Sequence, residues 1–137
     1  MQFTFRTSAV QSILIWGCDG NDHLQVNSNV SLPATIDGRC GDDRVTVGHG
    51  RNTISTDGGN DVIIAGNGNN TIDSGAGNDV AGGVGTQTVF DDDAQDRLTG
   101  GQGNDWFIAN TITDNSQIMD IITDLGSGEV ASDIDLD

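Results

Sequence analysis

Residues Asp43–Gly82 read DRVTVGHGRNTISTDGGNDVIIAGNGNNTIDSGAGNDVAG, and this stretch repeats every nine residues. An Asp or Asn recurs at Asp43, Asn52, Asp61, Asn70 and Asp79. An aliphatic residue follows two places later, at Val45, Ile54, Ile63, Ile72 and Ala81, and a glycine stands two places before, at Gly41, Gly50, Gly59, Gly68 and Gly77. A fixed period of this kind predicts a solenoid, in which each unit packs only on its neighbours.

The repeating unit predicts a turn followed by a short strand. Glycine adopts positive φ without steric cost, so the Gly-x-Asp segment can turn tightly. The aliphatic residue then lies in the middle of a strand of about three residues, where only one side chain points inward. Two units make one coil, so residues one coil apart should lie on adjacent strands about 4.8 Å apart. The predicted architecture is a parallel solenoid with two sheets.

Two copies outside this stretch complete the motif. Residues 100–108 read GGQGNDWFI, and residues 17–25 read GCDGNDHLQ, in which one glycine is replaced. Both closely resemble the haemolysin-type calcium-binding repeat of the repeats-in-toxin (RTX) family, Gly-Gly-x-Gly-x-Asp-x-U-x, where U is a large apolar residue; the resemblance covers about two-thirds of the chain. It implies an all-β fold, a right-handed parallel β-roll with irregular caps, that binds several Ca²⁺ ions and folds on binding them.

The resemblance also implies a biological setting. RTX repeats form structural parts of secreted or cell-surface proteins, which are exported through an uncleaved C-terminal signal, and catalytic chemistry lies in a separate domain. We therefore expect no enzyme activity in this chain. The sequence agrees, since it contains no Gly-x-Ser-x-Gly or His-Glu-x-x-His motif and no nucleophile next to a histidine.

The composition favours cations as ligands. The formal net charge is −16 and the pI is about 4.1, which disfavours nucleic acid and anionic membranes as partners. Carboxylates that recur on adjacent coils repel one another, so the fold should be weak until cations bridge them. No apolar run approaches the length of a membrane span, and no cleaved signal peptide is visible.

We expect a single domain over residues 1–137. Residues 1–16 would form an N-terminal cap, residues 17–108 the calcium-binding repeats, and residues 109–137 a C-terminal closing segment. Asp22 and Asp43 are separated by one coil plus three residues, which predicts a loop around Pro33, because proline is excluded from an internal strand ladder.

The nine-residue phase is expected to slip by one residue after Asp79. The next equivalent position would then be Gln87, with Asp96 and Asp105 following at intervals of nine.

Val62, Ile64 and Val80 should point outward and form an apolar patch. Such a patch could contact a neighbouring domain or a surface partner. An adhesion or docking module using this patch is the alternative function.

Alternate repeats should fall on opposite edges of the roll. Edge A would then carry only carboxylates, at Asp22, Asp43, Asp61, Asp79 and Asp96. Edge B would carry mostly amides, at Asn52, Asn70 and Gln87, and only then Asp105. Calcium prefers oxygen ligands that include carboxylates, so edge A is expected to hold a row of ions. Edge B would bind weakly or stack as a neutral amide ladder; the alternative is that Asn replaces Asp as a ligand and both edges fill.

The candidate metal ligands are the repeat aspartates, neighbouring acidic residues and turn glycines whose carbonyl groups face the ions. They are Asp19, Gly20, Asp22, Gly41, Asp42, Asp43, Asp57, Gly59, Asp61, Gly77, Asp79, Asp96, Gly103 and Asp105. Cys18 and Cys40 lie one coil apart, and either a disulfide or two free thiols would fit this spacing. A zinc site is not expected, because His23 and His49 fall on different edges.

Overall fold

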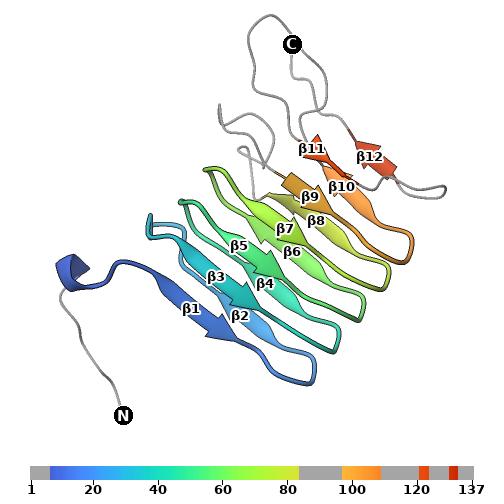
Figure 1. Cartoon of the computed structure of the whole chain (residues 1–137), viewed down its shortest axis with the longest axis horizontal. Coiled ribbons are helices and arrows are strands. Elements are labelled where there is room, and N and C mark those ends of the chain that lie inside the picture. The colour runs from blue at the N-terminus through green and yellow to red at the C-terminus, as the bar shows by residue number, and fades with distance from the viewer. Residues whose placement is uncertain (1–6, 84–96, 109–120, 124–129, 133–137) are drawn as a thin grey trace, which may run out of the picture.

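The computed structural model is a parallel solenoid in which successive strands alternate between two facing sheets (Figure 1). It describes residues 7–83, 97–108, 121–123 and 130–132. A short 3₁₀ helix, η1 (Thr7–Ala9), precedes the first strand. None of the helical segments within these ranges has the length and apolar character needed to cross a membrane.

Each sheet has six strands, and every neighbouring pair is parallel. The first sheet, sheet A, contains β1 (Ile13–Trp16), β3 (Ala34–Asp37), β5 (Thr53–Ser55), β7 (Thr71–Asp73), β9 (Arg97–Thr99) and β11 (Ile121–Ile122). The second, sheet B, contains β2 (His23–Gln25), β4 (Arg44–Thr46), β6 (Val62–Ala65), β8 (Val80–Gly83), β10 (Trp106–Ile108) and β12 (Val130–Ser132). Ile54 lies beside Ile72 and Val45 beside Ile63, so the one-coil register expected from the repeat is confirmed.

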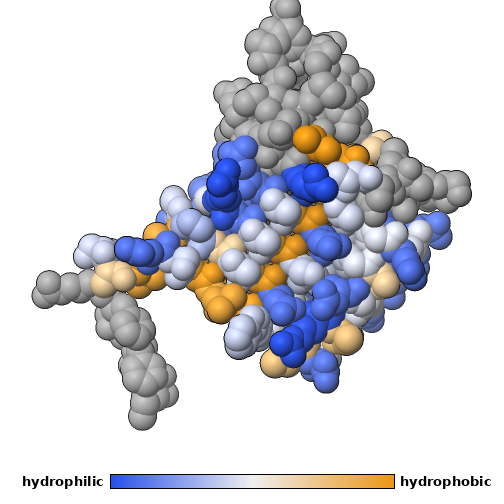
Figure 2. Space-filling model, viewed as in Figure 1, coloured by the Kyte–Doolittle hydropathy of each residue, from blue (hydrophilic) through white to orange (hydrophobic). Residues whose placement is uncertain are grey.

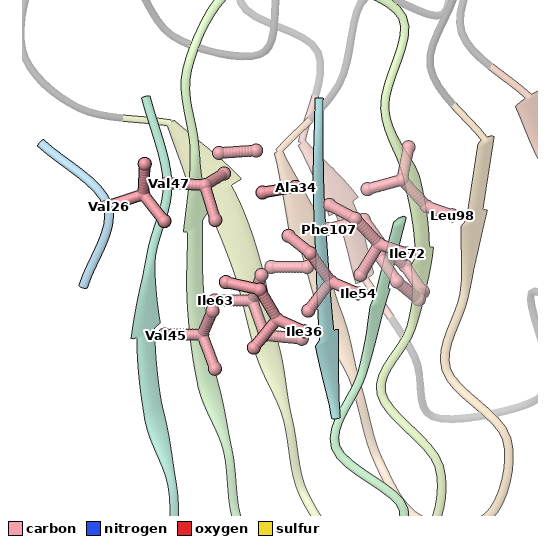
Figure 3. Close-up of a cluster of buried hydrophobic side chains, with 12 residues drawn as sticks. Val26, Ala34, Ile36, Val45, Val47, Ile54, Ile63, Ile72, Leu98 and Phe107 are labelled. Carbon is pink, nitrogen blue, oxygen red and sulfur yellow. The ribbon is translucent and has the colours of Figure 1, made fainter. Parts of the chain in front are cut away.

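The core is a narrow column of apolar side chains between the two sheets (Figure 3). Each three-residue strand directs its central side chain inward, and Ile54, Ile63 and Ile72 are at most 1% exposed. Burial of each such side chain contributes about 1.5–3 kcal/mol. The fully buried core consists of Val26, Ala34, Ile36, Val45, Val47, Ile54, Ile63, Ala65, Ile72, Ala81, Leu98 and Phe107.

The outer surfaces carry no broad apolar area on the face that Figure 2 shows, where hydrophobic residues form narrow bands among hydrophilic ones. At the C-terminal end, β11 pairs with β9 and β12 pairs with β10, so each sheet gains one closing strand. The N-terminal end begins with β1, which pairs only with β3 among the described residues.

The extra residues between Asp22 and Asp43 lie in the connection from β2 to β3. Pro33 directly precedes β3, and its carbonyl accepts a hydrogen bond from the Ile13 amide at 2.9 Å. Proline has no amide hydrogen to donate to a strand ladder, so it fits directly before β3 and not within it. The loop expected near Pro33 ends at this residue.

The expected phase after Asp79 is wrong. Trp106 pairs with Val80, which places Asp105 on the same edge as Asp79, and Arg97 pairs with Thr71 in sheet A. Asp105 therefore belongs to edge A, the reverse of the prediction. The reason is that one coil separates Asp79 from Asp105, although this interval is longer than the 18 residues of a regular coil. The side chains of Gln87 and Asp96 lie outside the described residues.

Candidate metal site

Edge A carries a continuous column of five aspartates, Asp22, Asp43, Asp61, Asp79 and Asp105. Each one directly precedes a strand of sheet B, so the strand register stacks the five side chains one coil apart. The last four are at most 3% exposed, and Asp22 is half-buried. We call each turn that ends in one of these aspartates a rung.

In every carboxylate after Asp22, one oxygen accepts a hydrogen bond from the backbone of the preceding rung. The Asp43 amide donates to Asp61 Oδ1 at 2.7 Å, and the Asp61 amide donates to Asp79 Oδ1 at 2.8 Å. The same bond joins the Asp22 amide to Asp43 Oδ1 at 2.8 Å and the Asp79 amide to Asp105 Oδ1 at 2.9 Å. The column is thus fixed in orientation along its whole length.

The second oxygen has no protein partner in four of these rungs. The Oδ2 atoms of Asp22, Asp43, Asp61 and Asp79 are buried and accept no hydrogen bond. The hydroxyls of Thr56 and Ser74 lie near two of the carboxylates, but their hydrogen bonds run to main-chain carbonyls of the next rung. Burying an unpaired carboxylate oxygen costs folding free energy, so a proton or a cation at each of these atoms would stabilise the fold.

Burial raises the pKa of these groups. Burial is the largest cause of the raised pKa at Asp43, Asp61 and Asp79, and the pKa of Asp79 is raised to about 6. The backbone amide bonds described above lower the pKa, as do the nearby hydroxyls at Asp61 and Asp79, whereas the neighbouring carboxylates of the column raise it further. Full ionisation of the aspartate column is therefore unfavourable in the folded protein.

The stability of the metal-free protein should consequently fall as the pH rises. Because the folded-state pKa lies above the unfolded value of 3.8, protonation stabilises the fold fully below about pH 4, and this effect is lost as the pH passes through about 6. We expect the β-sheet circular dichroism of the protein in chelator to be strongest near pH 4.5 and to be lost as the pH rises to about 7.5. In saturating calcium the dependence should reverse, since protons then compete with the ion. A metal-free protein that gains stability over this interval would contradict the assignment.

Edge B offers an internal comparison, because Asn52 and Asn70 occupy the same position there. Asn70 Oδ1 accepts a hydrogen bond from the Asn52 amide at 3.3 Å, as the aspartate Oδ1 atoms do on edge A. Asn52 Nδ2 donates to the carbonyls of Gly48 and Gly50 of its own turn, at 3.1 and 3.2 Å. Oδ1 of Asn70 is therefore held by a backbone amide, as in the edge-A aspartates. Nδ2 of Asn52 donates hydrogen bonds to the carbonyl groups of its turn.

This comparison shows what edge A lacks. The second atom of the group is an acceptor at Asp61 and a donor at Asn52, although Oδ1 binds a backbone amide on both edges. The turns themselves differ, because the residue four places before each column aspartate has positive φ and Gly48 and Gly66 on edge B do not. A hard cation would neutralise the unpaired carboxylate oxygens of edge A, and Ca²⁺ accepts both carboxylate and carbonyl ligands. No three acidic, histidine or cysteine side chains converge within the described ranges. An ion on edge A would therefore depend on main-chain carbonyls as well as carboxylates.

The turn glycines of edge A stack their carbonyl groups along the column. Gly20, Gly41, Gly59, Gly77 and Gly103 all have positive φ. At Gly41, Gly59, Gly77 and Gly103, an added Cβ would overlap the carbonyl of the corresponding glycine in the rung before. The carbonyl oxygens of these turns thus point along the stack toward the next rung, where the sequence placed them as candidate ligands.

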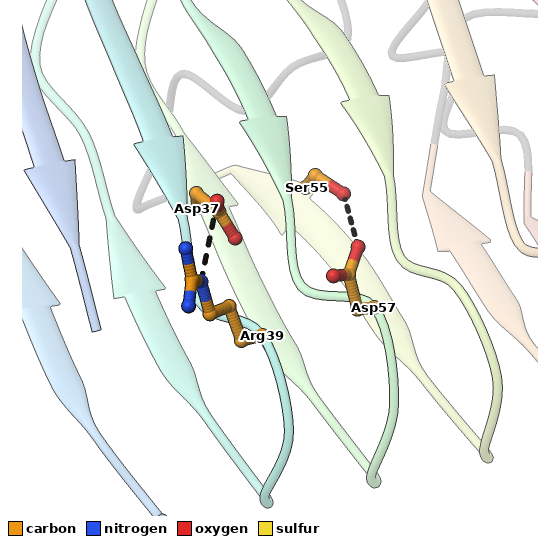
Figure 4. Close-up of polar contacts among 4 residues, drawn as sticks. All are labelled: Asp37, Arg39, Ser55 and Asp57. Carbon is orange, nitrogen blue, oxygen red and sulfur yellow. Dashed lines mark hydrogen bonds and ion pairs between the residues drawn. The ribbon is translucent and has the colours of Figure 1, made fainter. Parts of the chain in front are cut away.

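The three additional acidic residues lie at the surface of edge A. Asp19, Asp42 and Asp57 are exposed and do not join the buried column. Asp57 accepts a hydrogen bond from the Ser55 hydroxyl at 2.9 Å, and the neighbouring turn holds an Asp37–Arg39 ion pair at 3.6 Å (Figure 4). Asp42 Oδ1 accepts the Asn60 amide at 2.8 Å.

Asp42 belongs to a second ladder that was not anticipated from the sequence. The residue just before each column aspartate binds the next rung: its side-chain Oδ1 accepts the amide of its counterpart at 2.8–3.0 Å. The ladder consists of Asn21, Asp42, Asn60, Asn78 and Asn104. The signal was present, because Asn or Asp recurs at this place in every edge-A repeat. The hydrogen bonds of this ladder join successive turns at the surface, outside the buried column.

Two sets of candidates remain. Cys18 and Cys40 lie in the edge-A turns before Asp22 and Asp43, and both are exposed free thiols. The apolar patch is present on sheet B, where Val62, Ile64 and Val80 are partly buried, and its row continues in register through Trp106 and Val130. Trp106 is 49% and Val130 52% exposed.

Comparison with known proteins identifies the repeats. The sequence profile of the RTX calcium-binding nonapeptide repeat (4 copies) matches residues 46–81 and 82–111. Searches of curated proteins and of solved structures gave no match. The RTX repeat is a structural, non-catalytic module that binds calcium, and the parallel β-roll described above is the fold expected for it. The repeat region of this chain belongs to the RTX calcium-binding nonapeptide repeat family.

Proposed function

We propose that the chain binds a row of Ca²⁺ ions along edge A. The proposed carboxylate ligands are the column aspartates, namely Asp22, Asp43, Asp61, Asp79 and Asp105, and the turn carbonyls of Gly20, Gly41, Gly59, Gly77 and Gly103 supply further oxygens. The observation that carries the proposal is the set of buried Oδ2 atoms without a hydrogen bond at the first four aspartates. Each ion would lie between two successive rungs and neutralise both.

We further propose that calcium binding drives folding. The column exists only when the coils are stacked, so the unfolded chain has no comparable site. Binding to the folded state alone stabilises it by RT ln(1 + [L]/Kd) for each site, which is about 2.7 kcal/mol per ion when calcium exceeds Kd 100-fold. Several ions in one column therefore suffice to decide between the folded and unfolded states of a small domain.

A calcium titration of chelator-treated protein tests this proposal. We expect circular dichroism to change cooperatively from a disordered to a β-sheet spectrum, because each occupied interval orders two rungs. Magnesium at the same concentrations is the control, and it should act only weakly, since it demands a compact octahedral site and keeps its water ligands. A spectrum that stays the same from chelator to saturating calcium would refute the coupling.

We also propose that the protein acts outside the cytoplasm, as part of a secreted or cell-surface assembly that uses a C-terminal export signal. Extracellular calcium modules bind their ion at about 10⁻⁴–10⁻³ M, a range in which the chain would stay unfolded before export and fold afterwards. Recovery of the native protein only from the cell interior would argue against this location.

A further inference from the structure

We infer that edge B excludes calcium. The side-chain amides of Asn52 and Asn70 donate hydrogen bonds to the turn carbonyls that an ion would need as ligands. The inference rests on the proposed calcium sites of edge A and adds that the roll is one-sided. Each coil would then have one edge that depends on metal and one that does not.

The hydrogen bonds of Asn52 and Asn70 engage their own side-chain oxygens and two carbonyl groups of each turn. Asn70 Nδ2 donates to the carbonyls of Gly66 and Gly68 at 2.9 and 2.8 Å, which repeats the pattern of Asn52 one rung earlier. The side-chain oxygens are also occupied: Asn70 Oδ1 accepts from Asn52 Nδ2 at 2.8 Å, and Asn52 Oδ1 accepts from the Ala34 amide at 3.2 Å. A cation entering this space would face amide hydrogens.

Burial makes this arrangement hard to displace. Asn52 is 1% and Asn70 2% exposed, so a rotated carboxamide could not transfer its hydrogen bonds to water. Breaking them would leave buried donors and acceptors unsatisfied, at about 1–3 kcal/mol each. The amide ladder therefore supports this edge without an ion.

The charges of the two edges differ in the same sense. The edge-B turns at residues 47–52 and 65–70 contain no Asp or Glu, and the first of them carries Arg51. The edge-A turns contain the whole aspartate column, with Asp42 and Asp57 beside it. Calcium is thus attracted to the edge-A turns more strongly than to these two edge-B turns, in a chain whose overall charge is strongly negative.

A gain-of-site variant tests the inference. In Asn52→Asp/Asn70→Asp, carboxylate oxygens replace the two Nδ2 groups, so edge B gains two buried acidic side chains at the repeat position of the edge-A column. We expect this variant to bind about one more calcium ion than the wild type, in the interval between its two new carboxylates. The number of bound ions would be measured by elemental analysis after equilibrium dialysis and checked by calorimetry. The control, Asn67→Asp/Asn69→Asp, adds the same charge to edge B outside the amide ladder, with both changes in the turn at residues 65–70, and should leave the ion number unchanged.

The outcomes separate this inference from the proposed function. An unchanged ion number in folded Asn52→Asp/Asn70→Asp would overturn the inference, whereas a wild type that binds no calcium would overturn the proposed function. A second measurement does not depend on the variant: anomalous diffraction from calcium-loaded wild-type crystals should show ions at the edge-A column and none within ligand distance of Asn52 and Asn70. An ion bound by Asn52 and Asn70 would overturn the inference.

Discussion

The variant Asp43→Asn/Asp61→Asn/Asp79→Asn is expected to fold in chelator, where the wild type stays unfolded. The substitution turns three buried Oδ2 atoms into amide groups. Edge B shows what such groups do at this position, because Asn52 donates to both carbonyls of its own turn. Three metal-dependent rungs should therefore become metal-independent ones.

The expected effect is large because each substitution removes a buried oxygen without a partner. At about 1–3 kcal/mol for each group, the three changes add about 3–9 kcal/mol to the stability of the metal-free roll. Circular dichroism and thermal unfolding in chelator would measure it. The same variant should respond less to added calcium, since it has lost the proposed charged ligands.

The matched control for this variant is Asp43→Ala/Asp61→Ala/Asp79→Ala. It removes the same charge but supplies no amide, and it also deletes the Oδ1 acceptors that hold the preceding rungs. We expect it to stay unfolded both in chelator and in calcium. If both the Asn and the Ala variants fold in chelator, charge repulsion alone would explain the calcium requirement, and the hydrogen bonds of the amide groups would be irrelevant.

The variant Gly59→Ala is expected to prevent folding at any calcium concentration. Gly59 has a φ of 138°, and an added Cβ would overlap the carbonyl of Gly41 in the adjacent rung. Neither the backbone nor the neighbouring carbonyl can move without breaking the stack, so we expect a loss of at least about 3 kcal/mol. A calcium titration followed by circular dichroism would measure the loss.

The adjacent glycine provides the control for this prediction. An added Cβ at Gly58 would meet only the Ala76 carbonyl oxygen at 3.8 Å, and Gly58 is not among the residues with positive φ. Gly58→Ala should therefore change the free energy of unfolding by no more than about 1 kcal/mol. Equal effects at both positions would show that the close packing of successive turns does not constrain the fold.

The sequence predicted the sheets and core because one period determines both. The residue two places after each Asp or Asn must point inward in a three-residue strand, and Val45, Ile54 and Ile63 do so. The separation of carboxylates from amides also followed directly, since alternate repeats lie on opposite edges.

The phase after Asp79 could not be predicted in the same way. Periodicity locates repeats only while the chain adds them at a constant length, and the connection between β8 and β9 breaks that rule. Sequence spacing cannot tell on which edge the regular repeat resumes after this interval. The pairing of Trp106 with Val80 places Asp105 on edge A.

The orientation of the ligands was equally hidden from the sequence. Asp and Asn at one repeat position are nearly isosteric, and both use Oδ1 to hold the preceding rung. Only the geometry shows that Nδ2 of Asn52 donates to the turn carbonyls, whereas Oδ2 of Asp43 and Asp61 is buried without a hydrogen bond. This difference of one atom is the physical basis of the proposed calcium requirement.

The most direct test of the central claim measures binding and ordering together in the wild-type chain. Calcium would be added to chelator-treated protein while heat of binding and β-sheet ellipticity are recorded on matched samples. We predict that the two signals rise over the same calcium range, because the stacked aspartate column exists only in the folded roll. A β-sheet spectrum already complete in chelator at neutral pH, or calcium binding without any gain of β-structure, would contradict the account.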